Sequence, residues 1–267
     1  MSDYLFLANV GSGIVNSIQL TNFSPNRESK SRSKIEYKVG VYTQTSEDTS
    51  WKKLDEVSFK GEDNIFLSSE KYDLDIGQLA VVIPCRVDFH LLDGYTELPE
   101  PISRKVDSSP INERAAISFS KGELFSSYQG DFPYQMSRME NGTFLSFDSL
   151  AHRSSKDTKI KLIFVNIFSR KLNVKKRFSL VVANSLTKKK ITSVEYTHNS
   201  AGIIDIEIPD NLEVCFYSKD ALGIPLFVTW SSRHISVEHT HPPSEYFWNN
   251  KFKGQKMIKK KWLSQLS

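Results

Sequence analysis

Residues 35–42 read Ile-Glu-Tyr-Lys-Val-Gly-Val-Tyr, so apolar side chains alternate with polar or small ones. Successive side chains of a β-strand point to opposite faces, and this period of two therefore predicts a strand with one face in a core. Similar short apolar runs recur along the whole chain. They are Leu79–Pro84, Ile160–Ile167, Phe178–Ala183, Ile191–Tyr196, Ile203–Ile208 and Leu226–Trp230.

Short runs bounded by Ser, Asn, Asp, Gly and Pro are typical of a β-sandwich or barrel. Helical periodicity is nearly absent, with one exception between Gln255 and Leu266. The links between the runs are too short for crossover helices, which favours antiparallel pairing. The sequence therefore predicts an all-β fold with very little helix, built as tandem antiparallel β-sandwich domains of Ig-like or jelly-roll-like type.

A chain of 267 residues is long enough for two domains. A weak internal repeat favours this division, because residues 5–10 resemble residues 162–167, and residues 76–82 resemble residues 222–228. Prolines concentrate just before residue 115, which indicates a linker or an extended loop. The predicted parts are a β-sandwich over 1–98, a linker over 99–114, a second β-sandwich with an aromatic-rich first segment over 115–246, and a basic C-terminal tail over 247–267.

Several classes of protein do not fit the sequence. No apolar run approaches the ~18 residues of a transmembrane helix. The first charge is the acidic Asp3, and Gly11 ends the first apolar run early, so no secretory signal is recognised and we expect a cytoplasmic protein. Two cysteines are too few for a disulfide scaffold, and we expect Cys85 and Cys215 to be buried, reduced thiols.

Charge is divided unevenly along the chain. Residues 1–150 hold 15 Lys/Arg against 22 Asp/Glu and have a net charge of −7, whereas residues 151–267 hold 20 against 9 and have a net charge of +11. Such asymmetry predicts a basic face that meets an anionic partner. Attraction between the two halves, within a chain or between chains, is the alternative, and the second case would be self-association.

Basic side chains gather near predicted turns of the second domain. If loops at one end of a sandwich converge, these side chains form one anion-binding patch. The candidates are Arg170, Lys171, Lys175, Lys176, Arg177, Lys188, Lys189 and Lys190. The tail adds lysines interleaved with aromatic residues such as Trp262, a combination that binds phosphates and stacks on bases or sugars. A membrane surface is a further anionic partner.

The sharpest short motif is His239-Thr-His241-Pro-Pro-Ser-Glu245. Its spacing places two imidazoles on one side of a strand and a carboxylate beyond a turn, a set that can hold one divalent metal ion. Outside this motif we expect no cofactor. No Gly-x-Ser-x-Gly nucleophile motif is present, and no catalytic residue is identified.

A second surface candidate is aromatic. Tyr128, Phe132 and Tyr134 lie beside amide and carboxylate side chains, and such a loop can contact a sugar ring. Taken together, the sequence predicts a non-enzymatic binding or interaction protein whose basic second domain recognises a glycan or an anionic partner. The alternative is a metal-binding protein or metalloenzyme centred on His239, His241 and Glu245.

Overall fold

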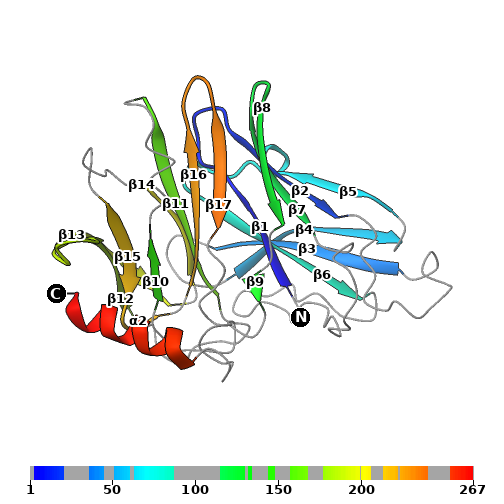
Figure 1. The fold of residues 1–267 in the computed structure, drawn as a ribbon. Coiled ribbons are helices and arrows are strands. Elements are labelled where there is room, and N and C mark those ends of the chain that lie inside the picture. Colours follow the sequence, from blue (N-terminus) through cyan, green and yellow to red (C-terminus); the bar gives the residue numbers. More distant parts are fainter. Residues whose placement is uncertain are drawn as a thin grey trace.

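The computed structural model describes residues 3–20, 36–44, 51–60, 63–86, 115–129, 132–133, 144–147, 157–167, 177–198, 200–205, 213–221, 223–239 and 253–266. Over these residues the chain is mostly β-structure, and the strands pair antiparallel in four sheets (Figure 1). The predicted all-β fold of sandwich-like domains with very little helix is confirmed. The finer assignment to an Ig-like or jelly-roll-like type stays a prediction.

The strands follow one another with few other elements between them. The first half of the chain holds β1 (Asp3–Ala8), β2 (Val15–Leu20), β3 (Glu36–Gln44), β4 (Trp51–Lys60), β5 (Ile65–Ser68), the 3-10 helix η2 (Ser69–Tyr72), β6 (Leu79–Arg86), β7 (Ala116–Lys121), β8 (Leu124–Gln129) and β9 (Phe132–Pro133). The second half holds β10 (Phe144–Phe147), β11 (Lys159–Asn166), β12 (Arg177–Asn184), β13 (Lys190–Thr197), β14 (Ser200–Asp205), β15 (Val214–Ser218), β16 (Ile224–Trp230), β17 (Ile235–His239) and the helix α2 (Lys253–Gln265).

The two halves of the chain share one strand topology. The first sandwich consists of sheets ordered β4-β3-β6-β1 and β5-β2-β7-β8, with the short β9 added beside β1. The second consists of sheets ordered β13-β12-β15-β10 and β14-β11-β16-β17. If β10 is taken as equivalent to β1, β11 to β2, and so on in chain order up to β17 and β8, the strand orders of the two sandwiches are identical. The hairpins β3–β4 and β12–β13, which are equivalent, also each contain a register shift.

This topology differs in two ways from what the sequence suggests. Residues 115–129 were expected in the second domain, but β7 pairs with β2 and β8 pairs with β7, which places both strands in the first sandwich. The predicted linker, residues 99–114, lies outside the described residues. The sequence repeat equates β1 with β11, whereas the topology equates β2 with β11. Short apolar runs resemble one another easily, so such a match does not establish which strands are equivalent.

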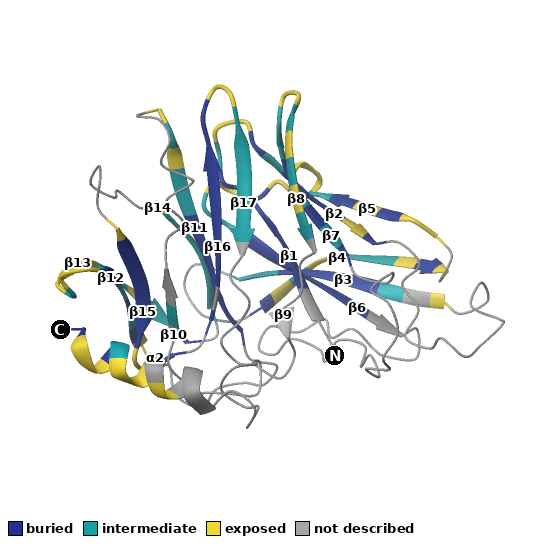
Figure 2. Ribbon diagram, in the orientation of Figure 1, coloured by how far each residue is buried: buried dark blue, intermediate teal, exposed yellow. Residues whose placement is uncertain are grey.

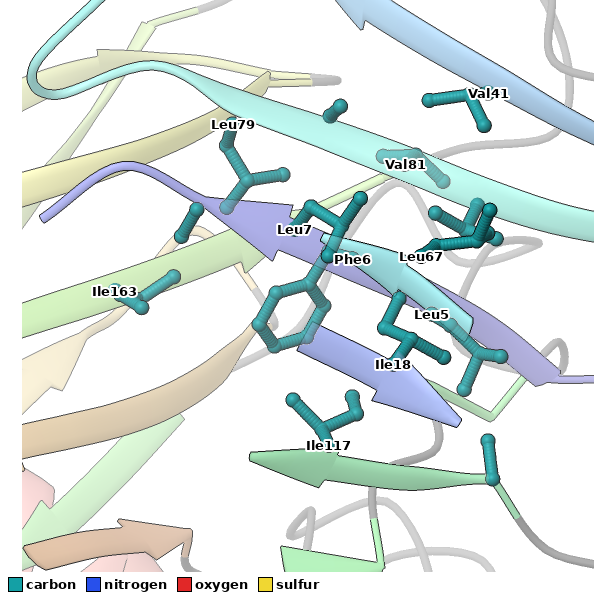
Figure 3. Close-up of a cluster of buried hydrophobic side chains, with 14 of the residues drawn as sticks. Leu5, Phe6, Leu7, Ile18, Val41, Leu67, Leu79, Val81, Ile117 and Ile163 are labelled. Atoms are coloured by element: carbon teal, nitrogen blue, oxygen red, sulfur yellow. The ribbon is translucent and has the colours of Figure 1, made fainter. Parts of the chain in front are cut away.

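The central strands of the sheet that contains β11, which are β11 and β16, are buried on both faces over most of their length, whereas the edge strands β14 and β17 are half-buried (Figure 2). Leu162 and Phe164 belong to the core between this sheet and the sheet of β12 and β15. Ile163 and Val165, which alternate with them, belong to the core that also holds residues of β1, β2, β6 and β7 (Figure 3). A strand covered on both sides needs apolar side chains at every position, which explains the continuous run Leu162–Val165.

The two sandwiches pack directly against each other. The equivalent strands β8 and β17 lie side by side, and the amide of Val237 donates a hydrogen bond of 3.1 Å to Ser126 Oγ (Figure 1). Ala201 in β14 donates to Gln44 Oε1 in β3 at 3.4 Å. One hydrophobic core therefore continues from the first sandwich to the outer face of the second.

Candidate polyanion-binding surface

The turn between β12 and β13 presents three consecutive lysines and has a well-defined backbone. Asn184 Oδ1 accepts hydrogen bonds from the amides of Leu186 and Thr187, at 2.9 and 2.8 Å. The Lys188 amide donates to the Asn184 carbonyl at 2.9 Å, and Lys188 has a left-handed backbone with φ of 63°. Asn is favoured where its side chain bonds the backbone of the following residues. The side chain of Asn184 thus fixes the direction in which the lysines leave the sheet.

The helix α2 covers the outer face of the sheet that contains β12 and β15 (Figure 1). Leu263 and Leu266 are buried against Ala183, Cys215 and Tyr217. Residues 247–267 were expected to be a basic tail, but residues 253–265 form a helix that packs on the second sandwich. The expected exception to the β pattern, between Gln255 and Leu266, coincides with this helix.

A cation–π contact joins the turn to the helix. The Lys188 ammonium lies over the ring of Trp262 and also donates a hydrogen bond to the carbonyl of Ser185. Contacts of this kind contribute about 0.5–1 kcal/mol where exposed and more where desolvated. Trp262 is half-buried, and the Lys188 ammonium covers one face of its indole ring. That face is therefore not open to a ligand in this structure.

Five lysines lie in the turn or on the part of α2 beside Trp262, and we call them the basic surface: Lys188, Lys189, Lys190, Lys260 and Lys261. Lys219 does not belong to it, because the register of β12 and β15 places this residue level with Ser179, near Arg177, where its Nζ donates to the carbonyl of Leu266 at 3.0 Å. An acid also lies beside these lysines: Glu213, whose carboxylate accepts from Ser185 Oγ at 3.4 Å. The excess of positive charge focuses a positive potential on this end.

Cys215 lies beneath α2, where burial makes its thiol a poor nucleophile. Burial raises the pKa of its thiol, while the nearby charge of Lys188 acts in the opposite direction. The thiol is free of any disulfide and is fully buried, in agreement with the expectation from sequence. The side chain of Cys85 lies outside the described residues.

The structure brings only part of the predicted anion-binding set together. Lys188, Lys189 and Lys190 lie in and just after the turn, but Arg177 begins β12 at the other end of the hairpin. At about 3.3 Å per residue, an eight-residue strand separates the two ends by roughly 23 Å. The remaining predicted residues, Arg170, Lys171, Lys175 and Lys176, lie outside the described residues.

The predicted metal ligands stay a prediction. His239 is the last residue of β17, with its backbone opposite Leu226, and its side chain is outside the described part of the structure. His241 and Glu245 also lie outside it. Among the residues that are described, no group of three or more His, Cys, Asp or Glu side chains is arranged to hold a metal ion.

The predicted sugar-contact residues also have mixed outcomes. Tyr128 is half-buried and packs against the hydrophobic core. Phe132 lies in β9, with its side chain outside the described set, and nothing is described for Tyr134. The exposed ring on β8 is that of Phe125, two residues after the β7–β8 turn.

Two features of the surface were missed in the sequence. One is the joint between the turn and α2, because Lys188 and Trp262 are far apart in the chain. The other is a row of serines that crosses four neighbouring strands in register. It consists of Ser68, Ser17, Ser118 and Ser127, between the exposed Phe66 and Phe125. The alternation of polar and apolar residues along β2 and β7 indicates which side chains share a face. The row itself becomes visible only when the pairing of the four strands is known.

The fold and this surface define a class: a protein of two packed β-sandwiches with a docked helix and a basic end. No family model, no curated protein and no solved structure matches the chain. Within the described ranges, no helix is both long and apolar enough to cross a membrane.

Proposed function

We propose that this chain is a non-enzymatic binding protein that holds a glycan or another anionic partner on the basic surface. The observation that carries the proposal is the contact between Lys188 and Trp262. It holds the turn against α2, so the exposed side chains of Lys189, Lys190, Lys260 and Lys261 come from two segments that are fixed to each other. Preorganised charges bind more tightly than the same charges on a mobile tail, because less ordering is needed.

Net charge supports the same assignment. The residues from 151 onward have a net charge of +11, against −7 for residues 1–150. A polyanion is therefore attracted to the second half and repelled by the first, which favours one orientation of binding. Neutralisation of one half by the other, within a chain or between two copies, is the rival explanation of this charge pattern.

Retention on immobilised heparin tests the proposal. In Lys189→Glu/Lys190→Glu two exposed lysines reverse their charge, whereas in Lys52→Glu/Lys60→Glu two exposed lysines of β4 in the first sandwich do so. We expect the first variant to elute at much lower salt than the wild type and the second to elute close to it. On duplex DNA, each lost phosphate contact should reduce the slope of log K against log salt by about 0.9.

Equal losses in the two variants would show that only net charge matters and would contradict a site at the basic surface. No retention of the wild type at low salt would contradict the proposal altogether. Elemental analysis of the purified protein tests the alternative of a metal site at His239, His241 and Glu245. If that alternative holds, the protein should contain one equivalent of a divalent metal.

A further inference from the structure

Two exposed apolar side chains lie among the lysines of the basic surface. Leu186, in the turn between β12 and β13, is 72% exposed and is followed closely by Lys189 and Lys190. Met257, on α2, is 71% exposed. Lys260 and Lys261 follow Met257 at spacings of three and four residues, which places them on the same side of the helix.

Both segments of this surface therefore combine a protruding apolar side chain with exposed positive charge. A nucleic acid or a sulfated glycan uses the charge and gains nothing from an exposed leucine. A bilayer with anionic lipids uses both, because headgroups attract the lysines and the acyl boundary receives the apolar side chain. Apolar residues surrounded by lysines are typical of surfaces that bind membranes without crossing them.

We infer that the basic surface docks on the headgroup region of an anionic phospholipid bilayer, with Leu186 and Met257 entering the interface. This inference rests on the proposed function, since the same lysines supply the attraction. The acidic residues 1–150, with a net charge of −7, are repelled by the same bilayer and so face away from it. Glu213 is an acid beside the lysines, and it reduces the attraction locally.

The docking is peripheral and reversible. Each lysine near an anionic surface changes binding by about fivefold, and one leucine at the interface changes it by roughly five- to tenfold. The contact between Lys188 and Trp262 matters here because it presents the two apolar side chains from segments with a fixed relation.

Cosedimentation with vesicles tests this inference with the full chain. The vesicles are pure phosphatidylcholine, or phosphatidylcholine with about 30% phosphatidylserine. The first variant is Leu186→Ser, and its matched control is Ile76→Ser, because Ile76 is 71% exposed on the link between η2 and β6 of the first sandwich. A second variant, Lys189→Glu/Lys190→Glu, removes the charge instead.

We expect binding to the phosphatidylserine vesicles only, and a loss that differs between variants. Leu186→Ser should bind these vesicles roughly five- to tenfold more weakly while eluting from heparin at the wild-type salt concentration. Ile76→Ser should match the wild type in both assays. The double lysine variant should lose at least about 25-fold on vesicles and also its heparin retention.

The outcomes separate the two proposals. Retention on heparin without binding to phosphatidylserine vesicles would overturn the lipid inference and leave the proposed function standing, with a nucleic acid or an acidic glycan as the partner. Equal vesicle binding by Leu186→Ser and the wild type would also overturn the inference, because the apolar contact would then be absent. Binding to neither heparin nor vesicles would overturn both.

Discussion

Removing the two leucines that anchor α2 should release the helix and uncover Cys215. Leu263 and Leu266 are both buried on the outer face of the sheet that contains β12 and β15. A buried Leu→Ala change costs about 2 kcal/mol at the lower end of its range, which suits a contact with sheet on one side and solvent on the other. The variant Leu263→Ala/Leu266→Ala should therefore favour the undocked helix by about 4 kcal/mol, or roughly a thousandfold.

The reaction of Cys215 with a thiol reagent measures this opening. The chain has two cysteines, so a Cys85→Ser background leaves Cys215 as the single reporter. Burial raises the pKa of this thiol. Undocking therefore accelerates labelling in two ways: it admits the reagent and it increases the thiolate fraction at a given pH. Heparin retention should fall in parallel, because the turn and the helix no longer present their lysines together.

Leu186→Ala is the control, because it makes the same substitution at an exposed leucine, and it should leave the labelling rate unchanged. An unchanged labelling rate in Leu263→Ala/Leu266→Ala would refute the assigned packing of α2. We also expect the helix to open while the two sandwiches stay folded. If Cys215 becomes reactive only at the denaturant concentration that unfolds the whole protein, this expectation is refuted.

Two further predictions concern stability. Gly223→Ala should destabilise the protein by about 1–3 kcal/mol in urea denaturation, because a Cβ there would lie 2.1 Å from a ring carbon of the buried Phe164; wild-type stability would show that this close approach is absent. Asp55→Asn should lower stability at pH 7 by less than about 1 kcal/mol, and this loss should become smaller as the pH falls below the ordinary pKa of an Asp carboxyl. Hydrogen bonds from Lys71 and Tyr72 to the Asp55 carboxylate, at 2.7 and 3.1 Å, lower its pKa, so its contribution is present above the ordinary pKa and is lost as the pH falls through the lowered one. A loss of stability that is the same at every pH would contradict this origin.

Strands and the helix could be predicted from the sequence because their patterns are local. The alternation in residues 35–42 corresponds to β3 (Glu36–Gln44), and the exception between Gln255 and Leu266 corresponds to α2 (Lys253–Gln265). Each pattern depends only on which side chains within a few residues share a face. Charge asymmetry was likewise readable from composition, and the basic face that it predicts stays a prediction.

Pairing was decided by the tertiary structure. The sequence placed residues 115–129 in the second domain, yet β7 pairs with β2 from near the start of the chain. The eight basic residues looked like one patch, yet Arg177 lies at the far end of the hairpin from Lys188. The joint between Lys188 and Trp262 has no local signal at all. Local patterns state which face of an element is apolar, whereas the choice of partner depends on packing between segments distant in the chain, which only the folded structure contains.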